Sequence, residues 1–212
     1  MIRLEIYQET AHFRIPSVGN PYLSYLLPPP STIYGFLRAI TDYESINFEN
    51  TKLSIQGSYK SISIEKERLI KIRKGSSERD IIPIQKLHEC RWIIHIKSPF
   101  EEKIIKAIKY SPKIFRLGRQ EDLIIDITIE EGLEELPFNK YEDIYEEETN
   151  IYLKWEQSQG QEGSIFSMAL DTIVDENKKI IDYKPVNLIY TRAETGAKYT
   201  NIFDGKYIIS YI

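Results

Sequence analysis

Apolar and polar residues alternate at the start of the chain, where Ile2, Leu4 and Ile6 are separated by Arg3 and Glu5. A period of two is typical of a strand with one buried face, so the pattern predicts an N-terminal strand. Pro and Gly then interrupt the pattern, which indicates a loop before the next element.

The spacing of apolar residues becomes that of a helix face after three consecutive prolines. The apolar positions at i, i+3, i+4 and i+7 are Ile33, Phe36, Leu37 and Ile40. We expect an amphipathic helix here, with the side chain of Ser31 or Thr32 capping its start.

Strand-like alternation returns at Leu53 and continues to Lys97 without a helical period. Lys-Gly-Ser-Ser at 74–77 divides it, so the simplest structure is a long hairpin, called the thumb below, around residues 60–90. A second helix follows, because Ser98 and Glu101 form a capping box with a proline between them. Renewed alternation then predicts one more strand.

The order strand, helix, two strands, helix, strand is that of the ferredoxin-like fold, in which two helices cover one face of an antiparallel sheet and the other face stays free. RNA-recognition domains use this fold. We therefore predict an α+β protein with a ferredoxin-like (RRM-like) domain at residues 1–131, which carries the thumb. Residues 132–150 are acidic and aperiodic, as in a linker. Residues 151–212 are expected to form a small β-rich region with a hairpin around Asp204 and Gly205.

The composition is that of an ordinary globular protein, with 212 residues, 42% hydrophobic and 28% charged. No apolar run approaches the roughly 20 residues of a membrane helix, and Met1 is not followed by a signal-peptide pattern. One cysteine, Cys90, excludes a disulfide within the chain. A cytoplasmic protein without a membrane partner is expected.

Charge is distributed unevenly along the chain, although the net charge is only -4. Residues 60–119 hold 16 Lys and Arg against 7 Asp and Glu, whereas residues 120–182 hold 4 against 18. A basic middle suits a phosphate-bearing partner, and an acidic flank suits a basic protein neighbour. We expect the carboxylates between Glu130 and Glu148 to face protein or solvent instead of RNA. Two solvated faces are the simpler alternative.

The histidines limit the enzymatic options. His88 and Cys90 would share one strand face while His95 falls on the other, so a four-ligand zinc site is not expected. Metal-free RNA cleavage needs one general base and a cation for the phosphate. His12 with Arg14 is a weak candidate for this pair, since a lone loop histidine is more often inert.

Two segments combine residue types suited to anion binding. In LPPPSTIYGFLRAI (27–40), a rigid proline start, two hydroxyls and a glycine would aim N–H groups at an anion, although good capping explains the pattern equally well. In FRLGRQEDL (115–123), Arg116 and Arg119 flank Gly118. Two guanidinium groups there suit a phosphate clamp or ion pairs with the acidic residues that follow.

Together with an N-terminal strand and a loop containing FRIP, these segments resemble the CRISPR-associated Cas-five family, a branch of the RAMP superfamily. The resemblance spans about the first 130 residues and is carried by LSYLLPPPSTIYGFLRAI and FRLGRQEDL. The family's proline-rich helix start is matched by Pro28, Pro29, Pro30, Ser31, Thr32 and Gly35. Its glycine-arginine segment is matched by Leu117, Gly118, Arg119, Glu121 and Asp122.

The resemblance implies a non-catalytic, RNA-binding subunit of a type I interference complex (Cascade), I-B like, that holds the 5′ handle of the CRISPR RNA in antiviral defence. The implied partners are this RNA, the seven-type backbone subunit and the large subunit, with target DNA contacted only indirectly; no cofactor and no metal are implied. The thumb would extend over the guide RNA. The predicted RNA-binding residues are Ser31, Thr32, Arg38, Lys66, Arg68, Lys71, Arg73, Lys74, Arg116 and Arg119. Arg79 belongs to the same basic thumb.

One branch of this family is itself a metal-independent endoribonuclease that processes CRISPR repeat RNA with Tyr, Lys and His. None of the three histidines here follows a lysine, so the chain departs from that branch. RNA cleavage is therefore the alternative function, not the preferred one.

Overall fold

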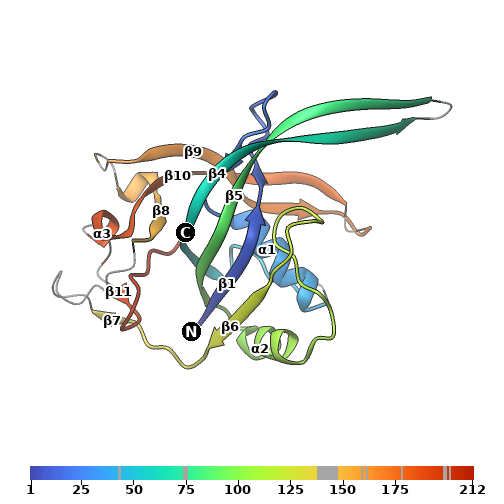
Figure 1. Cartoon of the computed structure of the whole chain (residues 1–212). Helices are drawn as coiled ribbons and strands as arrows, with labels where there is room; N and C mark the ends of the chain where they lie inside the picture. Colours follow the sequence, from blue (N-terminus) through green and yellow to red (C-terminus); the bar gives the residue numbers. More distant parts are fainter. Residues whose placement is uncertain are drawn as a thin grey trace.

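The computed structural model describes residues 1–42, 44–73, 76–137, 148–158, 160, 162–177, 179–197, 200 and 202–212; for residues 69–73 and 76–79 only the backbone is described. The chain is α+β, and its main feature is a seven-stranded sheet with the order β6-β1-β5-β4-β8-β10-β9 (Figure 1). Every neighbouring pair of these strands is antiparallel. The strands are β1 (Ile2–Ala11), β4 (Lys52–Arg73), β5 (Ser76–Lys97), β6 (Asp126–Glu130), β8 (Asn150–Lys154), β9 (Ser164–Val174) and β10 (Ile180–Arg192).

Two helices cover one face of the strands β6-β1-β5-β4, in the order that the sequence predicts. They are α1 (Pro30–Ile40) and α2 (Glu101–Tyr110). Alternate residues of β1 and β5 point toward them, so Leu4 and Trp92 share one buried cluster with Leu37 of α1 and Ile104 of α2. Burial of these apolar side chains is the main stabilising contribution to this half of the fold.

The thumb is present as the predicted hairpin. β4 and β5 keep one register from Lys52 opposite Lys97 to Arg73 opposite Ser76, and Lys60 and Glu89 are left out of the paired positions. β1 accompanies them only as far as Ala11 opposite Leu87, so the hairpin beyond that pair projects from the sheet (Figure 1). The turn residues 74–75 lie outside the described residues.

The C-terminal strands continue the same sheet instead of forming a sheet of their own. β8 pairs with β4 where Ile151 lies opposite Gln56, and β10 and β9 follow outward. Strands on both sides of the expected linker therefore share one sheet, and the boundaries 1–131, 132–150 and 151–212 stay a prediction. The smaller elements are β2 (Phe13–Arg14), β3 (Ser24–Tyr25), β7 (Leu136–Pro137), the 3-10 helix η2 (Trp155–Gln157), α3 (Ala193–Gly196) and β11 (Ile202–Phe203).

The second face of the sheet is not free, so that expectation was wrong. The chain returns over it after β11: Gln56 Nε2 donates to the carbonyl of Ile208 at 2.7 Å, and the N–H of Ser210 donates to Ser54 Oγ at 3.0 Å. The local hairpin predicted at Asp204 takes a small form, closed by the Asp204 N–H and the Tyr207 carbonyl. Sheet-face polar side chains that could bond RNA bases are thereby used inside the molecule.

The helix starts differ from the predicted caps. Pro29 occupies the N-cap position of α1 without a side-chain cap, and Ser31 and Thr32 lie inside the first turn. The prolines explain the shift, because Pro30 fits the first helical position with its fixed φ and missing N–H. For α2 the predicted return bond is present, from the Ser98 N–H to Glu101 Oε1 at 3.1 Å. Among the described residues no helix has the length and apolar character needed to cross a membrane.

Candidate nucleic-acid interface

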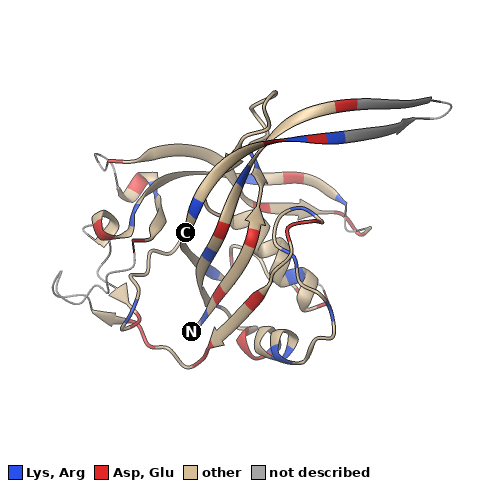
Figure 2. Cartoon of the chain, viewed as in Figure 1, with Lys and Arg blue, Asp and Glu red and all other residues tan. Residues whose placement is uncertain are grey.

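The described part of the thumb exposes two cations that the sequence singled out. Lys66 lies opposite Pro83 and Arg68 opposite Ile81, and both side chains are exposed. No ion pair or hydrogen bond involves either side chain among the described residues. Figure 2 shows acidic and basic positions next to one another along the outer part of β4. Since neighbouring strand residues point to opposite faces, the cations and the intervening glutamates lie on different faces of the thumb.

The remaining predicted thumb residues fall where side chains are not described. These are Lys71, Arg73, Lys74 and Arg79, of which Lys74 lies outside the described residues altogether. Their RNA contacts stay a prediction.

Arg119 is not a free cation. Its Nη1 lies 2.9 Å from Glu67 Oε2 on β4 and 2.9 Å from Glu121 Oε1, and its Nε lies 3.4 Å from Asp122 Oδ2. Of the two uses that the sequence left open, the structure has the ion pairs. Lys86 on β5 extends the contacts, with Nζ 2.8 Å from Glu67 and 2.9 Å from Glu65.

These six residues form what we call the base cluster: Glu65, Glu67, Lys86, Arg119, Glu121 and Asp122. Burial alone would raise the pKa of Glu67, but hydrogen bonds from Lys86 and Arg119 outweigh it and lower that pKa. Burial would likewise lower the pKa of Lys86, and the two glutamates raise it instead. Four carboxylates against two cations give a formal charge of -2, so this surface repels phosphate.

Arg116 remains available to a ligand. It is exposed and without an ion pair among the described residues, and it bridges to Leu123 in a short antiparallel ladder. Because directly opposed bridge partners share a face, Arg116 projects on the same side as Leu123. Leu123 and the nearby Ile114 and Ile125 are 42% to 76% exposed.

The start of α1 offers fewer donors than the sequence indicated. Pro30 has no N–H, and the N–H groups of Thr32 and Ile33 donate to the Pro29 carbonyl. Three of the first four helical positions therefore present no free N–H to an anion. Arg38 is bound internally, with Nη2 2.8 Å from Asp171 Oδ1 and Nη1 3.2 Å from the Ile46 carbonyl. RNA contacts of Ser31, Thr32 and Arg38 stay a prediction.

The three histidines occupy three separate sites. His12 is 2% exposed, and its Nδ1 donates to the Gln85 carbonyl at 2.7 Å. Burial lowers the pKa of His12. His88 is more accessible and lies 2.7 Å from Ser63 Oγ through Nε2. His95 is fully buried.

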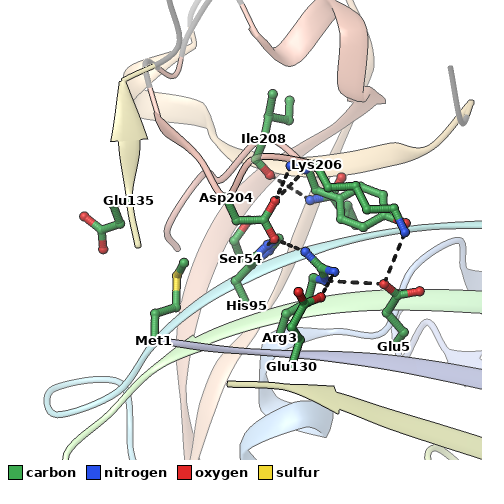
Figure 3. A network of polar contacts seen from close by, with 12 residues as sticks. Met1, Arg3, Glu5, Ser54, His95, Glu130, Glu135, Asp204, Lys206 and Ile208 are labelled. Carbon is green, nitrogen blue, oxygen red and sulfur yellow. Dashed lines mark hydrogen bonds and ion pairs between the residues drawn. The ribbon is translucent and has the colours of Figure 1, made fainter. Parts of the chain in front are cut away.

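His95 belongs to a buried polar network that the sequence did not indicate (Figure 3). Asp204 Oδ2 accepts from His95 Nε2 at 3.0 Å and from Arg3 Nη1, and Asp204 Oδ1 accepts the N–H groups of Lys206 and Tyr207. Burial opposes ionisation of Asp204, but the hydrogen bond from His95 and the backbone donors hold its pKa well below the usual range. The network holds the C-terminal segment on the sheet.

The charge asymmetry along the sequence is partly cancelled in space. Three carboxylates of the acidic stretch pair with cations from the N-terminal and basic segments: Glu130 with Arg3, Glu131 with Lys109 and Glu135 with Lys97. Glu148 is exposed, whereas Glu146 and Glu147 lie outside the described residues.

No known protein-family model matches the chain, and no curated protein matches its sequence. Solved structures do match. A chain of a "CRISPR RNA-guided surveillance complex" superposes with a TM-score of 0.59 at 10% identity, over 90% of this chain and 89% of that one. A "Cas protein" crystal structure superposes with a TM-score of 0.50 at 11% identity, over 90% and 92%. This chain has the fold of CRISPR-associated proteins.

The shared CRISPR-associated fold includes the C-terminal strands. Residues 1–131 are less than two thirds of the 212 residues, whereas the superpositions cover 90% of the chain. The superpositions therefore extend beyond residues 1–131.

Proposed function

We propose that this chain is an RNA-binding subunit of a CRISPR interference complex that holds the 5′ handle of the CRISPR RNA without cleaving it. The observation that carries the proposal is the projecting thumb on the fold of a surveillance-complex chain. Its Lys66 and Arg68 are exposed and have no ion pair or hydrogen bond with another described residue. Phosphates supply most of the affinity for RNA, and unpaired cations on an accessible strand suit them.

The strand order supports a finer classification. A ferredoxin-like unit has the strand order found here for β6-β1-β5-β4. It also has one helix between its first two strands and another between its last two, as α1 lies between β1 and β4 and α2 between β5 and β6. Because the C-terminal segment covers the second face, RNA is expected on the thumb and near Arg116, not stacked on the open sheet as in RNA-recognition domains.

The partners follow from this placement. A thumb that reaches away from the sheet suits contact with both the guide RNA and an adjacent seven-type backbone subunit. The exposed part of the acidic stretch suits a basic surface of the large subunit. The proposal places the chain in a type I complex, I-B like, that acts in cytoplasmic antiviral defence. The chain would contact target DNA only indirectly.

The non-catalytic role is supported by the position of His12, which is buried with its Nδ1 bonded to a carbonyl. A general base must reach the 2′-OH that it deprotonates. Cleavage of repeat RNA is the competing function, and His88 is the histidine accessible enough to serve it. Incubation of wild type and His88→Ala with repeat RNA in chelator separates the two: no product is expected from either protein.

The binding test compares two double variants that change charge equally. Lys66→Gln with Arg68→Gln removes the thumb cations, and Lys106→Gln with Lys179→Gln removes exposed cations elsewhere. Fluorescence anisotropy with handle RNA is measured over a salt series. The logarithm of the binding constant falls linearly with the logarithm of the salt concentration, and each lost phosphate contact to single-stranded RNA should lower the magnitude of this slope by about 0.7. The slope of the thumb variant should therefore be smaller by about 1.4 than that of wild type. Equal losses of affinity and slope in the two variants would mean that the RNA is attracted by the overall charge of the protein and not by the thumb.

A further inference from the structure

The thumb is held at its base on two sides beyond the point where β1 ends. On one edge Tyr22 extends the sheet: its N–H donates to the Pro83 carbonyl and its carbonyl accepts from the Gln85 N–H, both at 2.9 Å. The base cluster contacts both strands over the same stretch of the hairpin, at Glu67 on β4 and Lys86 on β5. From Glu67 to the last residue of β4 the hairpin extends about 20 Å on its own. Its direction is therefore set at the base.

Arg119 connects this base to the body of the protein. Its guanidinium contacts Glu67 of the thumb on one side and Asp122 on the other. Asp122 is fully buried, and its Oδ2 also accepts the N–H groups of His12 and Arg119. A planar guanidinium with several carboxylate contacts fixes geometry better than a lysine would.

Gly118 makes this arrangement possible. Its φ of +107° lies in the region that side-chain-bearing residues rarely adopt. A Cβ there would lie 2.9 Å from Asp122 Oδ2 and 3.3 Å from the His12 carbonyl oxygen. The glycine lets the Arg119 N–H and side chain both turn toward Asp122, so the glycine-arginine pair is built for an internal contact.

We propose that Arg119 is a positioning residue: through Glu67 it fixes the direction of the thumb and does not itself bind RNA. The effect of Arg119 on RNA affinity rests on the proposed RNA-binding function, whereas its effect on the orientation of the thumb can be measured without RNA. A phosphate would have to displace carboxylates from Arg119 within a surface of net negative charge.

The deciding variant is Glu67→Gln. Removing a carboxylate near bound RNA should raise affinity if Arg119 contacts phosphate, because the freed guanidinium becomes more available. Positioning predicts the reverse: affinity for handle RNA should fall about fivefold, and Arg119→Gln and the double variant should fall equally, because both residues act through one contact. Glu89→Gln is the matched control, because it removes an exposed thumb carboxylate whose one ion-pair partner among the described residues is Lys60. Its affinity should be unchanged or higher, not lower.

Thumb orientation is read from spin labels at Ser77→Cys on β5 and Glu102→Cys on α2, with Cys90 buried. Glu67→Gln should broaden the distance distribution, and the control should not. Unchanged distances, or higher RNA affinity of Glu67→Gln, overturn the positioning role. Broadened distances in a protein whose wild type binds no handle RNA would support positioning and reject the proposed function. Glu67→Gln leaves the Arg119–Asp122 contact intact, so it serves even if Arg119→Gln fails to fold.

Discussion

Asp204→Asn isolates the buried ion pair that holds the C-terminal segment on the sheet. The two carboxylate oxygens have separate partners: Oδ1 accepts the backbone N–H groups of Lys206 and Tyr207, and Oδ2 accepts Arg3 and His95. Asparagine can keep its oxygen at the Oδ1 position, so the turn stays bonded. Its amide nitrogen then replaces Oδ2 and faces two donors.

The expected cost follows from burial. The Arg3 side chain is 5% exposed and that of Asp204 is fully buried, so removing one charge leaves the other without its main partner in a dry environment. Breaking such a pair from one side costs about 3–5 kcal/mol. The remaining contacts of Arg3 with Glu130 and Glu5 place the expected value near the lower end, at about 3 kcal/mol.

Urea unfolding monitored by tryptophan fluorescence measures this cost. Asp175→Asn is the matched control, because Asp175 Oδ1 also accepts two backbone N–H groups, from Asn177 and Lys179. The control should lose less than about 1 kcal/mol, as surface changes usually do. A double-mutant cycle with Arg3→Met should show coupling of about 1–3 kcal/mol. Equal losses for Asp204→Asn and the control, or additive losses in the cycle, would refute the reasoning.

Three further outcomes are expected. Gly57→Ala should destabilise the protein by several kcal/mol in urea unfolding, because the added Cβ would overpack the centre of the sheet. It would lie 2.3 Å from the Arg91 carbonyl oxygen and 2.7 Å from the Trp92 ring. An alanine variant as stable as wild type would contradict this packing. Ser31→Ala should change stability by less than about 0.5 kcal/mol, since Ser31 is not the cap of α1 and alanine favours helices; a loss of about 1 kcal/mol would restore the capping role. Burial lowers the pKa of both His12 and His95 from 6.5, so below pH 6.5 the unfolded chain binds protons that the folded chain does not. The free energy of unfolding should therefore be highest above pH 6.5 and fall below that pH by at most about 2.7 kcal/mol per pH unit. An unfolding free energy that stays constant from pH 7.5 to 5 would argue against neutral, buried histidines.

Local patterns by themselves determined much of this protein. The period of two predicted β1 and the full length of the thumb, because strand pairing in a hairpin joins residues close in sequence. The i, i+3, i+4, i+7 spacing placed α1 correctly. The α1 cap was predicted at the wrong residues, because the proline sequence supplies the helix start that a hydroxyl would otherwise provide.

The site depended more on tertiary structure. Sequence showed that Arg119 could clamp a phosphate or pair with carboxylates, and only the fold brought Glu67, 52 residues away, within 2.9 Å of it. Likewise Asp204 meets His95 across 109 residues, and no local pattern records such a contact. The charge of a side chain is written in the sequence, but its availability to RNA depends on which opposite charges the fold places beside it. For that reason the tertiary structure alone decided that Arg119 and Arg38 are bound inside the protein, while Lys66, Arg68 and Arg116 are exposed and have no ion pair with another described residue.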